Sequence, residues 1–291
     1  MSTYANIRID LHTLNDLPVL SISAQEIIKA INDQEISIPE LCAMIETEPS
    51  LTARLLGLAN SAYFAYAGHV HSLKQAVYRV LGLKLTQSMC LGILVSEVLD
   101  PGQCPVFSGR RFWFTALTTA ILSRQFCANS RFLSSTDPGL AYTVGLLHNI
   151  GLLALVYKFP NLMTKLFEES LETEIPLREI LRTKCSVDQF EVGGWLAARW
   201  QFPKAIRITL QKQRDRGYQG PFDRLAALVG KSADLAEQIF LEREIPSSIQ
   251  QVASEYEILP SVADNLVYDL LNQLENLDLI ADLLYKRQDI G

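Results

Sequence analysis

The stretch Gly145-Leu146-Leu147-His148-Asn149-Ile150-Gly151 decides how this chain of 291 residues is interpreted. It places one histidine and one amide in a segment that is otherwise apolar, which is typical of a buried helix. We expect the helix to end here and to be closed by Gly151, because glycine adopts the backbone conformations that end helices.

The composition around this stretch is that of a folded protein with a large core. Hydrophobic residues make up 48% of the chain and charged residues 20%, which argues against disorder. Apolar runs are interrupted well before about 18 residues, so no membrane-spanning helix is expected. The N-terminus has no apolar core of a signal peptide. Both absences predict a cytoplasmic protein without membrane insertion.

The charge and the cysteines exclude several function classes. A net charge of −6 makes nucleic acid a poor partner, because phosphate binding needs a basic face. The best electropositive candidate is the basic stretch Lys204–Arg216, for which a solvated helix end is the favoured interpretation. The 5 cysteines are scattered and form no CxxC motif, so buried reduced thiols are expected. No cofactor is expected.

Apolar residues recur at helical spacing along the whole chain, and no segment alternates with the period of a strand. The pattern predicts an all-α protein with two helical lobes. Ser37 and Pro39 are placed to begin a helix. Residues 139–158 and 262–285 are each predicted as one helix. The break at 100–105 is rich in Pro and Gly and predicts lobes at 1–105 and 106–291.

The end of the chain is acidic as well as apolar. Residues 255–282 contain 7 carboxylates and no Lys or Arg, beside a leucine-rich stripe. An amphipathic core helix with a solvated acidic face is the favoured interpretation. The alternative is a docking surface for a basic partner.

Several motifs of the chain resemble the HDOD family, helical proteins of bacterial signalling whose C-terminal part is similar to the HD metal-dependent phosphohydrolases. The most specific is Ala59-Asn60-Ser61-Ala62. The other matching motifs include Leu17-Pro18, Glu48-Pro49-Ser50-Leu51, His71-Ser72-Leu73, Phe112-Trp113 and Glu191-Val192-Gly193-Gly194-Trp195-Leu196. The resemblance covers about residues 13–240. It implies a helical N-terminal lobe followed by an HD-like helical lobe.

The resemblance also indicates where an HD enzyme would hold its metals, and most of these positions have lost their ligands. The residual HD-site positions are Thr115, His148, Asn149, Phe190, Gln213, Arg214 and Asp234. Only His148 and Asp234 remain as weak metal candidates. Two ligands without a bridging carboxylate hold a divalent cation poorly, so we expect no metal and no catalytic residue.

The roles of the two remaining residues are open at this stage. One interpretation is a buried hydrogen-bonded pair, in which Asp234 orients the imidazole of His148. The other is a residual pocket that binds a small ligand without converting it. Arg214 would then contact an anionic group of that ligand.

These observations favour a non-catalytic, regulatory signal-transduction module that binds a protein partner or a small ligand. A partner surface is expected at Asn60, Ser61, Tyr63 and Phe64, although Asn60 and Ser61 are also explained as a helix end. Two alternatives are kept. One is a metal-dependent phosphohydrolase or cyclic-dinucleotide phosphodiesterase with an atypical ligand set. The other is a sensor that binds a nucleotide without hydrolysing it.

Overall fold

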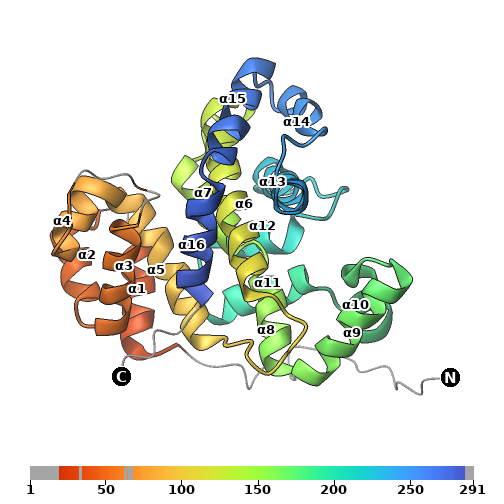
Figure 1. Cartoon of the computed structure of the whole chain (residues 1–291), viewed down its shortest axis with the longest axis horizontal. Helices are drawn as coiled ribbons and strands as arrows, with labels where there is room; N and C mark the ends of the chain where they lie inside the picture. The colour runs from red at the N-terminus through yellow and green to blue at the C-terminus, as the bar shows by residue number, and fades with distance from the viewer. Residues whose placement is uncertain (1–19, 33–34, 62–63, 65–67, 286–291) are drawn as a thin grey trace.

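The computed structural model describes residues 20–32, 35–61, 64 and 68–285, and within these ranges it contains helices and no strand (Figure 1). The predicted all-α fold is therefore confirmed. The N-terminal helices gather at one end of the molecule, coloured orange in Figure 1. They are α1 (Ile22–Asn32), α2 (Ile38–Ile45), α3 (Pro49–Ala59), α4 (Leu73–Ala76), the π-helical turn η2 (Val77–Leu81) and α5 (Gly82–Val98).

The beginning of α2 follows directly from its sequence. The Ser37 hydroxyl accepts a hydrogen bond from the Glu40 N–H, and the Glu40 carboxylate accepts one from the Ser37 N–H at 2.9 Å. This reciprocal pair satisfies two backbone donors that a helix start would otherwise leave free. Pro39 lies in the first turn, where its missing N–H costs nothing.

The second set of helices begins after the loop at residues 99–108. Its elements are α6 (Gly109–Asn129), the short η3 (Arg131–Leu133), α7 (Pro138–Leu147), α8 (Ile150–Lys158), α9 (Pro160–Thr173), α10 (Leu177–Cys185), α11 (Gln189–Arg199), α12 (Lys204–Lys212), α13 (Asp223–Glu242), α14 (Ile249–Glu255), α15 (Pro260–Leu271) and α16 (Leu274–Tyr285). The central helix is α6, which packs against α7, α13 and α16.

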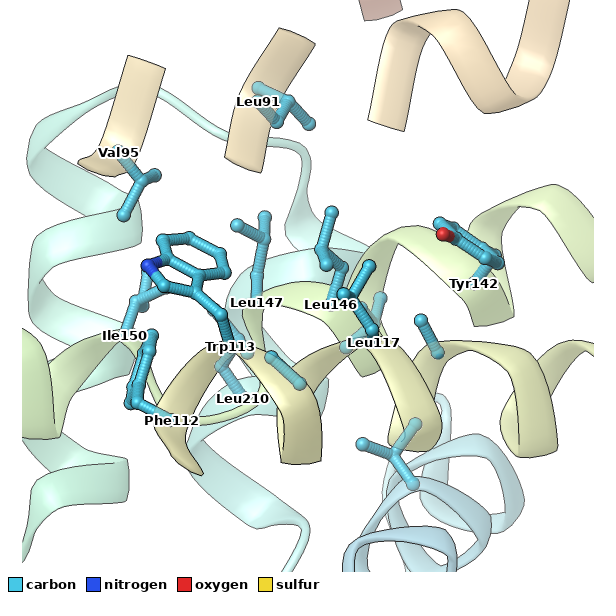
Figure 2. Packing of buried hydrophobic residues seen from close by; sticks show 14 of the residues in the cluster. Leu91, Val95, Phe112, Trp113, Leu117, Tyr142, Leu146, Leu147, Ile150 and Leu210 are labelled. Carbon is cyan, nitrogen blue, oxygen red and sulfur yellow. The ribbon is translucent and has the colours of Figure 1, made fainter. Parts of the chain in front are cut away.

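The core around α6 is dense and aromatic. Trp113 is 2% exposed and meets Phe112 edge to face, with ring centres 5.1 Å apart. Figure 2 shows Trp113 among Leu91 of α5, Leu147 of α7 and other buried side chains. Ser88 of α5 and Thr143 of α7 share a hydrogen bond of 2.6 Å. One core thus extends through both halves of the chain, and the division at residue 105 stays a prediction.

Two long helices predicted from periodicity are each two helices in the structure. Residues 139–158 divide into α7 and α8 at His148–Asn149, and residues 262–285 divide into α15 and α16 at Asn272–Gln273. A helix does end within the stretch 145–151, at Leu147, but the expected closure at Gly151 is wrong, because this glycine lies inside α8. Its lack of a side chain permits close backbone contact with α11.

The last helix returns across the molecule to the N-terminal helices. In Figure 1, α16 runs between α6 and the N-terminal helices, and it contacts α3, α5 and α6. Asp278 of α16, whose side chain is 17% exposed, forms ion pairs with Arg110 at 3.1 Å and Arg243 at 3.3 Å. The Arg54 guanidinium of α3 donates to the carbonyl oxygens of Leu283 and Leu284, at 3.2 and 2.6 Å. Part of the acidic C-terminal face is therefore used within the fold.

Burial accounts for the remaining apolar features. All 5 cysteines are free and buried, as predicted. Two stretches, Leu73–Val98 and Pro138–Lys158, are long and apolar enough by length and composition to cross a membrane, but 61% and 72% of their most apolar windows are buried within the protein. Buried core helices of globular proteins are often as long and as apolar as these two stretches.

Candidate functional site

The residual HD-site positions centre on the break between α7 and α8. Leu147 is the last residue of α7 and Ile150 the first of α8, so His148 and Asn149 form the connection. The Asn149 side-chain oxygen is buried and has no hydrogen-bond partner among the described residues. The polar doublet thus interrupts a segment that the apolar pattern alone would continue as helix.

His148 is buried, with 7% of its surface exposed, and is held by its own helix. Its Nδ1 lies 2.8 Å from the Gly145 carbonyl oxygen, which can only accept, so Nδ1 is the protonated nitrogen. Burial lowers the pKa of this imidazole to about 4, because desolvation disfavours the charged form. The hydrogen bond to Gly145 opposes this shift, and the nearby Arg214 adds to it. The imidazole is therefore neutral at pH 7.

The free energy of unfolding is expected to fall as the pH is lowered from about 6.5 to about 4. Between these values the unfolded chain binds a proton at His148 and the folded protein does not, so protonation favours the unfolded state. The loss is of order 3 kcal/mol. Urea unfolding at pH 7, 6 and 5 measures it. The His148→Gln variant should show a weaker pH dependence, and identical slopes for the two proteins would refute the assignment.

Thr115 and Phe190 stand at two further positions of the residual HD site, and neither offers a free atom to bind a metal. The Thr115 hydroxyl donates within α6, to the carbonyl oxygens of Arg111 and Phe112 at 3.0 and 3.1 Å. Phe190, in the first turn of α11, is 6% exposed. The guanidinium carbons of Arg178 and Arg214 lie 5.5 and 5.8 Å from its ring centre, within the range of cation–π attraction. An apolar ring flanked by two cations thus stands where a metal ligand would be expected.

The last three positions, Gln213, Arg214 and Asp234, are each engaged by a neighbouring residue and do not converge on a shared point. The Gln213 side-chain amide donates to the His148 carbonyl oxygen at 2.7 Å. Arg214 and Asp234 form an ion pair of 2.6 Å. The expected hydrogen-bonded pair of His148 and Asp234 is wrong: Asp234 is exposed and its carboxylate is engaged by Arg214, while His148 is held by Gly145.

These residues do not fit a divalent cation. Among the described residues, no group of three or more His, Cys, Asp or Glu side chains could hold a metal ion. Arg214 brings a positive charge to the Asp234 carboxylate, which would otherwise be the best anionic ligand. Divalent cations are bound by several anionic or neutral donors, so this arrangement opposes such binding.

A half-open groove of about 560 Å³ lies beside these positions. Gln213, Arg214 and Asp234 line it, so they connect the groove to the residual HD site. The cations Arg178, Arg216 and Lys231 also line it. The basic stretch 204–216 was visible in the sequence, but Arg178 and Lys231 come from α10 and α13. Arg214 and Arg216 follow the end of α12, and no periodic signal joins three segments that are so far apart in sequence.

A buried carboxylate fixes one wall of this groove. Asp188 is fully buried and accepts hydrogen bonds at 3.0 Å from the backbone N–H groups of Phe190 and Glu191, which caps α11. It also pairs with Arg178 and Arg182, each at 2.8 Å. Asp188 was not predicted from the sequence, although an acidic residue three positions before Glu191 is a capping-box signal.

The expected partner surface lies among the N-terminal helices, directly after α3. The Asn60 side chain donates to the carbonyl oxygens of Leu56 and Val70 and accepts from the Val70 N–H at 2.8 Å. Asn60 therefore links the end of α3 to the backbone at Val70, as a polar residue at a helix end does. Ser61 and Phe64 are partly buried, and Tyr63 lies outside the described residues. The partner surface stays a prediction.

Comparisons with known proteins place this fold in context. The family model of the HDOD domain matches residues 17–215. An uncharacterized protein of Treponema pallidum (strain Nichols) is 28% identical over 201 residues, which are 68% of this chain and 37% of that protein. The chain thus spans well under half of this relative, and α13–α16 lie beyond the family match.

Solved structures share the architecture. A candidate signal transduction protein from Marinobacter aquaeolei VT8 has a TM-score of 0.80 and 26% identity, with 98% of this chain and 64% of that chain covered. A candidate phosphohydrolase from Shewanella amazonensis SB2B has a TM-score of 0.77 and 22% identity, with 94% and 97% covered. An HDOD domain protein of unknown function from Geobacter sulfurreducens has a TM-score of 0.73 and 20% identity, with 95% and 98% covered. The last two likenesses concern the fold alone.

Proposed function

The chain belongs to the HDOD domain family, and from this premise we propose that it is a non-catalytic, regulatory signal-transduction module. The family and the Marinobacter aquaeolei relative support a signalling module. We propose further that it acts by binding a protein partner or a small ligand. The observation that carries the non-catalytic part is the Arg214–Asp234 ion pair beside buried Phe190.

The chemistry of HD-type hydrolysis explains why this observation matters. A bound metal would activate water and offset the charge of the phosphate. Here Arg214 already neutralises the last carboxylate, and Phe190 offers no donor atom. The groove can therefore bind an anion through its cations, and its two carboxylates, Asp215 and Asp234, are each paired with a cation, which supports binding without hydrolysis. A regulatory module needs to bind its ligand and does not need to convert it.

The partner and the location of the protein are part of the same proposal. A signalling protein is the expected partner, and the Asn60–Phe64 region of the first lobe is the expected contact. We also propose a cytoplasmic protein, in keeping with the burial of its two most apolar stretches. Nucleic acid is not proposed as a partner, because the net charge is −6.

Metal analysis tests the non-catalytic assignment. Protein purified from medium supplemented with iron, manganese and nickel is expected to carry less than about 0.1 equivalent of metal, because too few donors converge. It should also leave p-nitrophenyl phosphate and cyclic di-GMP unhydrolysed when these metals are added.

The His148→Ala variant is the control that separates a specific metal from adventitious binding. A stoichiometric metal that is present in the parent protein and lost in this variant, together with hydrolysis, would replace our proposal by the phosphohydrolase alternative. Metal retained equally by both proteins lies outside this site and leaves the proposal in place.

A further inference from the structure

The groove beside the residual HD site is positively charged, although the whole protein is negatively charged. Four cationic side chains line it, Arg178, Arg214, Arg216 and Lys231, against the carboxylates of Asp215 and Asp234. The local charge is therefore +2, whereas the whole chain carries −6. Such a reversal within a concave surface concentrates anions there.

The partners of these cations leave the excess intact. Arg178 and Arg182 share Asp188, Arg214 pairs with Asp234, Lys212 with Asp215, and Lys231 with Glu255. Arg216, which is exposed, has no ion-pair or hydrogen-bond partner among the described residues. Adding the ion-pair partners that lie outside the groove lining, Arg182, Lys212, Asp188 and Glu255, gives six cations and four carboxylates, which is again an excess of two positive charges. A phosphate monoester carries a charge of about −1.5 to −2 at pH 7.

An aromatic hollow adjoins the cationic groove. It has a volume of about 270 Å³ and is lined by the rings of Phe132, Tyr218 and Tyr256. Its remaining lining residues are Asp223, Arg224 and Glu255, and Ala227 and Lys231, which it shares with the groove. Phe132 is 40% exposed, and the Arg224 guanidinium carbon lies 4.8 Å from its ring centre. A flat ring can stack on such a surface, and stacking contributes about 1–3 kcal/mol per base in other proteins.

We infer that the groove and the hollow together form a binding site for a nucleoside phosphate. The phosphate groups lie among Arg178, Arg214, Arg216 and Lys231, and the base lies against Phe132 and Tyr218. Both volumes together fall within the range of about 300–1,000 Å³ that is usual for ligand pockets. This inference rests on the proposed function, since it names the small ligand of the module.

The two-part lining favours this ligand over simpler ones. Inorganic phosphate or pyrophosphate would use the cations and leave the aromatic hollow unfilled. A nucleic-acid strand would extend over the acidic remainder of the surface, which repels it. Several lining residues, among them Lys231 and Tyr256, lie beyond the family match at residues 17–215. The ligand preference is therefore a property of this chain rather than of the HDOD core.

Isothermal titration calorimetry of the intact chain at low ionic strength tests the inference. The probes are AMP, ATP, GMP and GTP, with adenosine, guanosine and pyrophosphate as partial ligands. At least one nucleotide should bind with a dissociation constant below about 1 mM. Its nucleoside and pyrophosphate should each bind at least about tenfold more weakly, because each fills only one half of the site.

Variants assign the two halves separately. Arg216→Ala and Lys231→Ala should each weaken nucleotide binding about tenfold, the effect of losing one charge-assisted contact. Phe132→Leu should weaken nucleotide binding by a similar factor and leave pyrophosphate unaffected. Lys204→Ala is the matched control, because Lys204 is an exposed cation at the start of α12 outside the groove lining. Circular dichroism before titration confirms that each variant is folded.

Three results would overturn the inference: no nucleotide binds below about 1 mM; the two cation variants bind as the parent does; or pyrophosphate binds as tightly as the best nucleotide. The proposed function fails differently. A nucleotide that binds here and is hydrolysed with a metal would refute the non-catalytic role and keep the site. A protein that binds neither metal nor nucleotide would refute the site and keep the non-catalytic role.

Discussion

Replacing Gly151 by Ala is expected to lower the free energy of unfolding by about 4 kcal/mol, a large share of the 5–15 kcal/mol that is typical of a folded domain. A β-carbon at this position would overlap the Gln189 carbonyl oxygen and the Gly193 nitrogen, and it would lie 2.9 Å from the Gly193 α-carbon. All three atoms belong to the backbone of α11, which no side-chain rotation can move aside. The helices α8 and α11 would have to separate.

A second glycine provides the matched control. Gly57 lies inside α3, and a β-carbon there would meet nothing within 4 Å. Gly57→Ala should therefore raise the free energy of unfolding by about 0.5–1 kcal/mol, the usual gain from alanine in a helix. Urea unfolding of both variants makes the comparison. A cost below about 1 kcal/mol for Gly151→Ala would contradict the close contact of α8 and α11.

Removing the Asp188 carboxylate is the second change with a large expected effect. Asp188→Ala should cost about 3–5 kcal/mol, because it removes the cap of α11 and leaves Arg178 and Arg182 without their shared counter-ion. The carboxylate is fully buried, so water does not replace the lost contacts. Thermal or urea unfolding at pH 7 measures the effect.

Two variants separate the cap from the charge. Asp188→Asn keeps a side-chain oxygen for the N–H groups of Phe190 and Glu191 but loses the charge, so its cost should lie below that of Asp188→Ala. Asp137 caps α7 through the Gly139 N–H, and its side chain is 52% exposed. Asp137→Ala should cost only about 1 kcal/mol. Equal costs for Asp137→Ala and Asp188→Ala would show that the buried ion pairs add nothing.

The local elements of the fold were predictable because their signals are local. Ser37, Pro39 and Glu40 mark the start of α2 within four residues, and the structure confirms the helix there. The stretch 145–151 predicted a helix end, but the exact break at His148–Asn149 was missed because apolar residues continue on both sides of it, so periodicity predicts one helix over 139–158. The break at Asn272–Gln273 was missed for the same reason. Most residues of α7 and α8 are buried, so the sequence there shows little amphipathic contrast. The amphipathic pattern of α15 and α16 continues across the break between them, with leucines on both sides of it.

The candidate site was predictable only in part. Family resemblance located Phe190, Arg214 and Asp234, and the structure places the Arg214 guanidinium in contact with both of the others. The resemblance could not show that Asp234 pairs with Arg214 instead of His148, since either residue is a plausible partner for a carboxylate. Lys231 of α13 joins the groove only through tertiary packing, and nothing near it in the sequence indicates a role.

The position of α16 also affects how the chain can be made. Arg54 finds its carbonyl acceptors 229 and 230 residues further along, at Leu283 and Leu284. At about 5–20 residues per second, the ribosome releases these acceptors on the order of 10–50 s after Arg54. During this interval the N-terminal helices expose the surface of α3 and α5 that α16 will cover, and long-range closure of this kind slows folding. Synthesis from the N-terminus therefore leaves α3 and α5 without their last packing partner until the end of the chain has been made.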